Sequence, residues 1–211
     1  MYTLPTDLPA SLALIQASVG ADDAARLEQA YRFAEAAHNG QTRDEGTPFI
    51  EHPVRVATIL WNELGQRDDV DLIIAALCHD TVEDSEDVEP ELLESFFGPA
   101  IASMVLDVTK PPAAPGEKEA RDRAYLDKLP KLSMRSRLLK LADRIDNLRA
   151  VVHSREPGKA QRYLTVSRQE FIPLALQTDP VAARLVIEAC DNLERHLQTR
   201  AGAANGPAIS G

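Results

Sequence analysis

The segment Val70-Asp-Leu-Ile-Ile-Ala-Ala-Leu-Cys-His79-Asp80 is the stretch of this 211-residue sequence that decides its fold class. Apolar residues recur in it at the spacing of one helical face, at Val70, Ile73, Ile74, Leu77 and Cys78. The uninterrupted apolar run within it, residues 72–78, is the longest in the chain. It is too short for a membrane-spanning helix, which needs about 20 apolar residues. We therefore expect a core helix and no membrane insertion.

The rest of the chain shows the same helical period, and no stretch alternates apolar and polar residues as a half-buried strand does. The sequence therefore predicts an all-α fold of about ten helices. One domain is expected over residues 1–200, followed by a disordered tail over 201–211 that is rich in small and polar residues. The predicted helices span residues 8–18, 22–38, 52–64, 69–82, 90–97, 99–108, 118–129, 131–150, 159–177 and 179–198.

Capping residues mark some of these helix ends. Asp22 and Asp179 are predicted N-caps, because an aspartate side chain accepts hydrogen bonds from the first helical turn. Gly65 and Gly98 are predicted helix ends, since glycine adopts the left-handed conformation that commonly follows a helix.

The charge of the chain restricts its partners. It has 23 lysine and arginine residues against 33 aspartate and glutamate residues, a formal net charge of −10. Such a field repels the phosphate backbone of nucleic acids, so we expect no nucleic-acid partner. A small phosphorylated substrate can bind only where local cations or a metal ion reverse the field.

The two cysteines, Cys78 and Cys190, are too few for a disulfide framework or a cysteine-rich zinc site. Both lie in apolar helical patterns and are expected to be buried thiols. No charged-then-apolar secretory leader opens the sequence. We therefore expect a cytoplasmic protein.

The chemistry-bearing residues begin where the apolar segment ends, with His79-Asp80-Thr-Val-Glu83-Asp84. On one continuous helix, His79 would stack over Glu83 and Asp80 over Asp84. One imidazole and three carboxylates at the end of a buried helix are unfavourable unless something pairs with them, and a divalent cation would do so. The alternative is a solvated or hydrogen-bonded helix end that opens an acidic loop.

Two other segments offer matching ligands. His52 precedes Pro53 at the mouth of a predicted helix, and Asp143 lies in an apolar helical stripe where its carboxylate is expected to face inward. Two histidines and two aspartates suit Mn²⁺, Fe²⁺, Co²⁺ or Zn²⁺, with positions left open for water, and oxygen-rich sets favour Mn²⁺. Glu83 and Asp84 would then hold or deprotonate that water. The spacing predicts a metal-dependent phosphohydrolase.

Four stretches, in the correct order, resemble the hydrolase domain of the RelA/SpoT-homologue family of alarmone synthetases and hydrolases. They are His38-Asn-Gly-Gln-Thr-Arg43 with Gly46-Thr-Pro-Phe-Ile-Glu-His52-Pro-Val-Arg-Val-Ala57, Ala75–Asp84, Phe96–Lys110 and Leu139–Arg149. The resemblance extends over about residues 22–177 and implies an HD-domain helical bundle with a central metal cleft. Because the chain is too short for the synthetase half, it resembles the stand-alone small hydrolases of this family.

The resemblance implies a reaction and the residues that perform it. The reaction is removal of the 3′-diphosphate of guanosine tetra- or pentaphosphate, which gives pyrophosphate and GDP or GTP. One Mn²⁺ ion would be bound by His52, His79, Asp80 and Asp143. Glu83 and Asp84 would activate the attacking water.

Substrate-binding residues are also implied by the resemblance. Arg43 would stack its guanidinium on the guanine base, and Asn147 would contact the sugar. On the following helix, Lys159, Arg162 and Tyr163 match a tyrosine and a basic residue of the family only loosely. Solvated charges and a plain amphipathic-helix aromatic are the alternatives there.

Lys140 and Arg144 would help an acidic protein hold a polyanion. They could equally form a surface ion pair with Asp84 or Asp146.

Some positions depart from the family pattern. Phe49 stands where the family often has tyrosine, and the loop 111–123 has no close match. Three cations, Lys118, Arg121 and Arg123, could supply phosphate contacts from that loop or be solvated. Of the remaining histidines, His38 is expected to form a helix-end hydrogen bond. His153 and His196 are expected to be structural or exposed.

Two other functions are compatible with the same residues. One is hydrolysis of another phosphate ester, such as the 2′-phosphate of NADPH or a nucleotide monophosphate. The other is a catalytically silent nucleotide-binding module. In each case the partner is a small molecule, and an oligomer is compatible with the sequence.

Overall fold

The computed structural model describes residues 9–44, 46–154, 156 and 158–204, and within them the expected all-α fold is confirmed. The α-helices are α1 (Ala10–Gln16), α2 (Ala21–Ala37), α3 (Glu51–Thr58), α4 (Val70–Cys78), α5 (Thr81–Asp84), α6 (Pro90–Phe97), α7 (Pro99–Val108), α8 (Lys118–Lys128), α9 (Met134–Ala150), α10 (Lys159–Val166), α11 (Ile172–Leu176) and α12 (Pro180–Ala204). Two π-helical turns, Ile59–Glu63 and Ser167–Phe171, and two 3₁₀ turns, Leu129–Lys131 and Val151–His153, extend helices. Extended pairing in this part of the chain is limited to an isolated bridge between Thr42 and Pro48.

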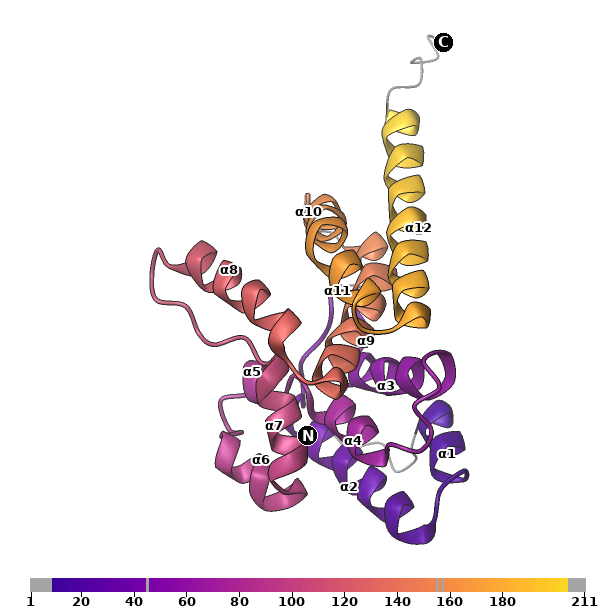
Figure 1. The fold of residues 1–211 in the computed structure, drawn as a ribbon, viewed down its shortest axis with the longest axis vertical. Helices are drawn as coiled ribbons and strands as arrows, with labels where there is room; N and C mark the ends of the chain where they lie inside the picture. The colour runs from indigo at the N-terminus through magenta and orange to yellow at the C-terminus, as the bar shows by residue number, and fades with distance from the viewer. Residues whose placement is uncertain (1–8, 45, 155, 157, 205–211) are drawn as a thin grey trace.

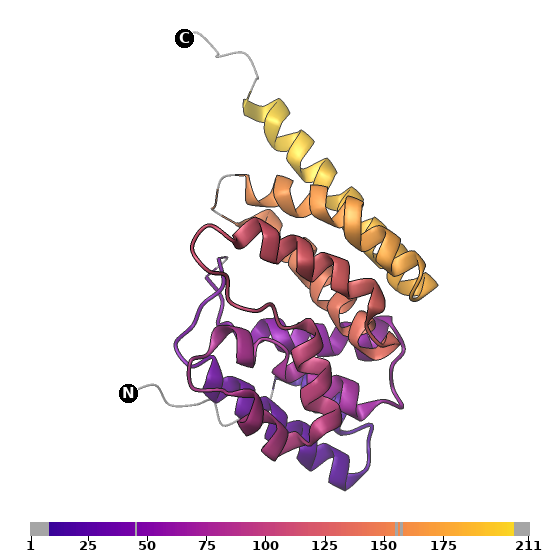
Figure 2. The ribbon, with the colours of Figure 1, turned by 60° about the vertical axis from the view of Figure 1, so that its left-hand side comes forward.

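The helices form two groups that meet at α9 (Figures 1 and 2). Helices α1 to α7 make the lower group, and α10 to α12 lie on the other side of α9. Helix α9 packs against α3 and α7 below and against α12 above. Because α9 faces both groups, polar residues on it can contribute to a site between them.

Helix α4 is the core helix that the sequence predicts. Its residues 72–78 are all fully buried, and it packs against α2, α3 and α7. A helix that is apolar on every side must lie inside a domain. Its start is capped by Asp69, whose carboxylate accepts a hydrogen bond from the backbone N–H of Leu72 (3.1 Å).

The helix expected over 69–82 is divided, and this changes the local geometry of the His79-Asp80 pair. Helix α4 ends at Cys78, and α5 begins at Thr81. Two carbonyl groups at the end of α4 find side-chain donors, since His79 Nδ1 donates to Ala76 (2.8 Å) and the Thr81 hydroxyl donates to Cys78 (2.8 Å). The expected stacking of these residues on one continuous helix is therefore wrong.

The helix expected over 159–177 is divided as well. A π-helical turn, Ser167–Phe171, separates α10 from α11, which carries Pro173 near its start. Proline has no N–H to continue the hydrogen-bond ladder, so the chain widens by one residue before it resumes. The chain nevertheless continues as consecutive helical turns from α10 to α11, as Figure 2 shows.

Some helix ends differ from the expected ones, and one predicted cap is confirmed. Helix α2 begins at Ala21 with Gly20 as N-cap, so Asp22 lies in its first turn instead of capping it. Asp179 does cap α12, accepting hydrogen bonds from the N–H groups of residues 181 and 182 (2.8 Å each). Helix α12 runs to Ala204, four residues into the expected tail, and residues 205–211 lie outside the described part.

Two further expectations concern burial and membranes. Cys78 and Cys190 are buried free thiols, as expected. Among the described residues, no helix is both long and apolar enough to cross a bilayer.

Candidate metal centre and active site

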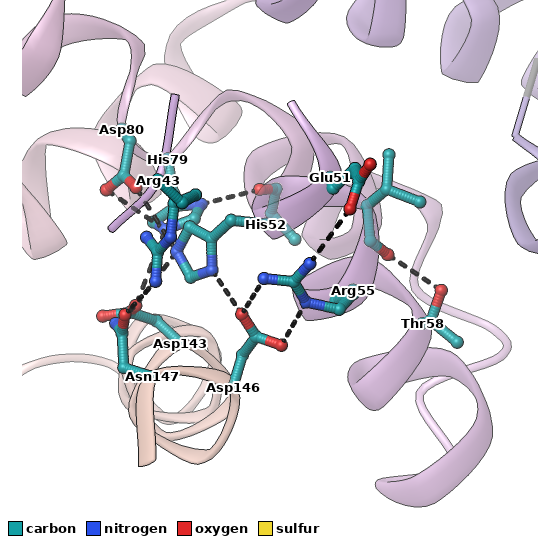
Figure 3. A network of polar contacts seen from close by, with 12 residues as sticks. Arg43, Glu51, His52, Arg55, Thr58, His79, Asp80, Asp143, Asp146 and Asn147 are labelled. Carbon is teal, nitrogen blue, oxygen red and sulfur yellow. Dashed lines mark hydrogen bonds and ion pairs between the residues drawn. The ribbon is translucent and has the colours of Figure 1, made fainter. Parts of the chain in front are cut away.

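Three parts of the chain bring two histidines and two aspartates together between α3, α4 and α9 (Figure 3). His52 lies in the first turn of α3, His79 and Asp80 follow α4, and Asp143 lies in the middle of α9. We call these four residues the metal cluster. Three of them are buried, and Asp80 is half-buried. The structure thus brings together the four residues that sequence analysis singled out as metal ligands.

The donor atoms of the metal cluster face one another. His52 Nε2 lies 3.4 Å from Asp80 Oδ2 and 3.3 Å from Asp143 Oδ1. His79 Nε2 lies 3.1 Å from Asp80 Oδ1 and 3.9 Å from Asp143 Oδ1. One donor atom from each of His52, His79 and Asp80 lies within 4.8 Å of the others. Donor atoms of three residues thus lie around one point, and the Asp143 carboxylate borders them.

Each histidine of the cluster is oriented by its other ring nitrogen. His52 Nδ1 lies 2.6 Å from the carboxylate of Asp146, and His79 Nδ1 lies 2.8 Å from the carbonyl oxygen of Ala76. A carbonyl and an ionised carboxylate only accept hydrogen bonds, so Nδ1 carries the proton in both rings. In the neutral ring, Nε2 is left with a lone pair directed into the cluster.

The cluster fits a divalent cation. Nε2 of His52 and of His79 are both buried without a hydrogen-bond partner, which is unfavourable unless another group binds them. Ligand bonds of about 2.0–2.2 Å place neighbouring donor atoms roughly 3.0–3.5 Å apart. Three of the four nitrogen–oxygen separations given above match that spacing.

The electrostatics of the cluster also favour a cation. Burial raises the pKa of Asp143, but the Lys140 ammonium and the nearby histidines outweigh it and hold that pKa well below its usual range. Asp80 is half-buried, and its contacts with His79 and His52 outweigh the loss of solvation and lower its pKa in the same way. Both carboxylates therefore stay ionised and form an anionic cradle.

Glu83 and Asp84 lie on α5, directly after the cluster residues. Burial, followed by repulsion from the carboxylates of Asp80 and Glu83, raises the pKa of Asp84 to about 6. Glu83 Oε2 accepts a hydrogen bond from the backbone N–H of Lys110 (2.8 Å), and the backbone carbonyl of Asp84 accepts one from Gln41 (2.8 Å). The short helix is thus attached both to the loop after α7 and to the loop before α3.

A cavity of about 160 Å³ opens between the loop before α3, α9 and α10. We call it the Arg43 pocket; it is lined by Thr42, Arg43, Asp44, Phe49, Asn147, Ala150, Val151, Ser154, Lys159 and Tyr163. The Arg43 guanidinium donates to Asn147 Oδ1 (2.7 Å) and lies 5.5 Å from the centroid of the Phe49 ring. Asn147 in turn donates to Asp143, so a chain of hydrogen bonds connects the pocket to the metal cluster.

The loop that carries Arg43 is closed by its own backbone. The N–H of Arg43 donates to Thr47 (2.9 Å), and the N–H of Gly46 donates back to Arg43 (2.8 Å). Gly46 has a φ of 91°, a left-handed conformation that residues with a Cβ rarely adopt. A glycine at this position therefore permits the tight turn that directs Arg43 into the pocket.

A second cavity, of about 330 Å³, lies on the other side of Tyr163. We call it the basic pocket; it is lined by Lys110, Lys118, Asp122, Tyr125, Leu126, Lys140, Arg144, Arg162, Tyr163 and Val166. Five cations against one carboxylate reverse the acidic field of the protein at this point. Lys140 also contacts the metal cluster, because its Nζ lies 2.8 Å from Asp143 Oδ2. The basic pocket therefore adjoins the cluster.

The expected substrate-binding residues fall into these two pockets. Arg43, Asn147, Lys159 and Tyr163 line the Arg43 pocket, and Lys140 and Tyr163 line the basic pocket. Lys159 forms an ion pair with Asp44, which ties α10 to the Arg43 loop.

The ion pairs that sequence analysis offered for Lys140 and Arg144 take a different form. Lys140 pairs with Asp143, and the Arg144 guanidinium lies over the rings of Phe171 (3.9 Å) and Tyr163 (4.9 Å).

The three cations considered for the loop 111–123 lie on α8, one lining the basic pocket and the others outside it. Lys118 lines the pocket. Arg121 donates to the carbonyl of Pro111 (2.7 Å), and Arg123 pairs with Asp127 and Glu170 on the exterior.

The other three histidines do not join the metal cluster. His38 is buried at the end of α2, where Nδ1 lies 3.0 Å from Gln41 Oε1. His153 is exposed, and His196 is half-buried on α12.

Sequence reasoning did not assign roles to four residues that shape the site. Asp146 contacts Nδ1 of His52, and Arg55 pairs with Asp146. Tyr125 and Lys110 line the basic pocket. Asp146 could have been found from its position one turn after Asp143 on the same helix. No sequence signal identifies Arg55, since its pairing depends on how α3 crosses α9.

Comparisons with known proteins show the family to which the chain belongs. The model of the HD domain family matches residues 30–200. Over 154 residues the chain is 42% identical with guanosine-3′,5′-bis(diphosphate) 3′-pyrophosphohydrolase MESH1 of Danio rerio, covering 72% of this chain and 81% of that protein. The chain belongs to the HD-domain family and, within it, to the MESH1 family. An HD domain implies a divalent metal, and the cluster of His52, His79 and Asp80 supplies ligands for it.

Other proteins and a solved structure are similar to this chain as well. MESH1 of Homo sapiens is 42% identical over 157 residues, which cover 74% of this chain and 83% of that protein. The bifunctional (p)ppGpp synthase/hydrolase SpoT of Escherichia coli K12 is 36% identical over 166 residues, or 77% of this chain but 23% of SpoT. A solved structure of a metazoan SpoT orthologue that hydrolyses ppGpp superimposes with a TM-score of 0.64 at 27% identity, covering 89% of this chain and 98% of the other. The expected family and HD-domain fold are confirmed.

Proposed function

We propose that this protein hydrolyses guanosine 3′,5′-bis(diphosphate) and the corresponding pentaphosphate at the 3′-diphosphate. The observation that carries the proposal is the 42% identity with the Danio rerio and Homo sapiens MESH1 hydrolases over 81% and 83% of their lengths. In the reaction the oxygen of water bonds to the phosphorus on O3′. The bond between that phosphorus and O3′ breaks, and O3′ leaves with a proton as a hydroxyl group. The products are pyrophosphate and GDP or GTP.

The proposed metal ion is one Mn²⁺, held by His52, His79, Asp80 and Asp143. Two imidazoles with two carboxylates make a mixed nitrogen and oxygen set that suits Mn²⁺ among the divalent transition metals. When bound, such a cation lowers the pKa of a coordinated water and neutralises charge on a phosphoryl group.

Glu83 and Asp84 are the proposed proton acceptors for the attacking water. A carboxylate accepts a proton more readily as its pKa approaches the working pH. The pKa of about 6 at Asp84 supports this role. Glu83 has a second role, because its hydrogen bond to the backbone of Lys110 anchors the loop that borders the basic pocket.

The two pockets supply the proposed contacts for the rest of the substrate. The Arg43 pocket would hold the guanine base against the Arg43 guanidinium, with Asn147 at the sugar. The basic pocket would hold phosphate groups through Lys140 and neighbouring cations. Tyr163, which lines both cavities, and Lys159, at the rim of the Arg43 pocket, complete the proposed binding residues. The proposed location is the cytoplasm.

The test is product analysis with the purified protein. Manganese-loaded protein is incubated separately with guanosine tetraphosphate, the pentaphosphate and NADPH, and the products are separated by anion-exchange chromatography. The proposal predicts GDP or GTP and pyrophosphate in equal amounts, formed at least about 100-fold more slowly by the Glu83→Gln variant. Phosphate from NADPH with no turnover of either guanosine compound would transfer the function to NADPH. Metal-loaded protein that binds the tetraphosphate without turnover would make it a binding module.

A further inference from the structure

A carboxylate outside the metal cluster holds one of its histidines. Asp146 lies on α9 three residues after Asp143 and is 3% exposed. Its Oδ2 atom is 2.6 Å from Nδ1 of His52. This contact fixes the rotation of the His52 ring and keeps the proton on Nδ1. Nε2 is thereby left free to bind a cation.

Asp146 is itself fixed by a second residue of α3. Arg55 donates from Nε to Oδ1 of Asp146 (2.7 Å) and from Nη2 to Oδ2 (3.1 Å). His52 and Arg55 are three residues apart on α3, so both reach the same carboxylate on α9 (Figure 3). A planar guanidinium that contacts both oxygens of a carboxylate restricts its orientation more than a single contact does.

The second histidine of the cluster is held differently. His79 Nδ1 donates to the backbone carbonyl of Ala76, a contact that no substitution of the acceptor's side chain removes. The two imidazoles therefore differ in how they are oriented. His52 is oriented by the side chain of Asp146, whereas His79 is oriented by a backbone carbonyl of α4.

We propose that Asp146 is a positioning residue for the metal centre, and that with Arg55 it orients His52 for binding the cation. The inference deepens the proposed function, since it concerns the metal site of the same reaction. Such outer partners of a metal-binding histidine typically contribute about 10- to 100-fold to metal affinity. Their effect is measured on the metal directly, without the substrate.

The variants are chosen to separate charge from packing. Asp146→Asn keeps the volume and one acceptor oxygen but removes the negative charge, so we expect Mn²⁺ binding weakened about tenfold. Asp146→Ala removes the acceptor as well, and we expect a loss of up to about 100-fold. Asp146→Ala could destabilise the fold, and the asparagine variant keeps the test valid in that event.

Glu63→Gln is the matched control. Glu63 lines the same 480 Å³ cavity as Asp146 and is also paired with an arginine through two contacts, from Arg149 Nη1 (2.7 Å) and Nη2 (2.8 Å). It contacts no residue of the metal cluster in the described structure. Its neutralisation should change Mn²⁺ affinity less than twofold while removing an arginine–carboxylate pair that is more exposed than that of Asp146.

The measurement is Mn²⁺ titration of metal-stripped protein by calorimetry, with the thermal midpoint of each metal-free variant recorded alongside. Ring ¹⁵N chemical shifts report which nitrogen of His52 carries the proton. The proposal predicts weaker Mn²⁺ binding by both Asp146 variants, Glu63→Gln like wild type, and loss of the Nδ1–H population at His52 in Asp146→Ala. Wild-type affinity in Asp146→Asn and Asp146→Ala would overturn the inference and leave the proposed function standing. Failure of wild-type protein to bind Mn²⁺ would overturn both.

Discussion

Lys140 and Asp143 lie on successive turns of α9, with Lys140 Nζ 2.8 Å from Asp143 Oδ2. The same ammonium lies 5.4 Å from the centroid of the Tyr125 ring and borders the basic pocket. One cation thus contacts a proposed metal ligand and a proposed phosphate site. It is largely buried, so its charge is screened little by solvent.

Lys140→Met separates these two contacts. We expect KM for guanosine tetraphosphate to rise about tenfold or more, equivalent to roughly 1.4 kcal/mol of binding, because a phosphate contact is lost. Mn²⁺ affinity should stay the same or increase, because Asp143 loses a competing cation. Steady-state kinetics and metal titration of the variant check both statements, with the exposed Lys131→Met as control. Weaker Mn²⁺ binding with an unchanged KM would contradict the placement of Lys140.

Substitutions at the proposed proton acceptors should differ from substitutions at the ligands. Glu83→Gln and Asp84→Asn are expected to lower kcat by about 10²- to 10⁴-fold, the usual contribution of a general base, with metal content near that of wild type. His79→Ala is expected to lose the metal as well as the activity. Metal content by atomic emission and turnover of the same preparations decide between these outcomes. Near-full turnover in both Glu83→Gln and Asp84→Asn would show that another group activates the water.

Arg43→Lys tests the planar group in the smaller pocket. Lysine keeps the charge but has no flat guanidinium to stack or to donate to Asn147 in the same geometry. We expect KM for guanosine tetraphosphate to rise about tenfold with a smaller change in kcat. Arg26→Lys on α2 is the control, because Arg26 pairs with Asp23 and Asp71 and lines neither pocket. Equal kinetics in Arg43→Lys and wild type would remove Arg43 from substrate binding.

Asp179→Ala tests the capping of α12. The aspartate accepts two backbone hydrogen bonds at the start of the helix, and such a cap contributes about 1 kcal/mol. In a protein of this size, that corresponds to a thermal midpoint lower by roughly 2–4 °C. Calorimetry of the metal-free protein measures it. A change in Mn²⁺ affinity with no change in the midpoint would contradict a purely structural role.

The sequence predicts the helices and the metal cluster because both are encoded in regular spacing. The helical spacing of apolar residues over 70–78 indicates a buried helix, and His79-Asp80 at its end combines groups that are unfavourable there without a partner. Asp143 is detectable for the same reason, as a charge inside an apolar stripe. In these cases the local spacing alone predicts which residues are buried, and the fold buries the same residues.

Other features depend on side-chain contacts that the apolar spacing does not encode. The helix breaks after Cys78, where the side chains of His79 and Thr81 donate hydrogen bonds to carbonyl groups of α4. The apolar pattern of this segment favours a continuous helix instead. Asp146 is meaningful only once α3 and α9 cross, because its partners His52 and Arg55 lie more than 90 residues earlier. The ion pair between Lys159 and Asp44 likewise joins the start of α10 to the loop before α3.

The measurement that tests the central claim most directly is pyrophosphate release from guanosine tetraphosphate by metal-stripped protein, titrated with Mn²⁺. The account predicts no release without metal and full restoration at one Mn²⁺ per chain, with His79→Ala silent throughout. Undiminished pyrophosphate release in the presence of a chelator, or no release from folded protein carrying one Mn²⁺ per chain, would contradict it.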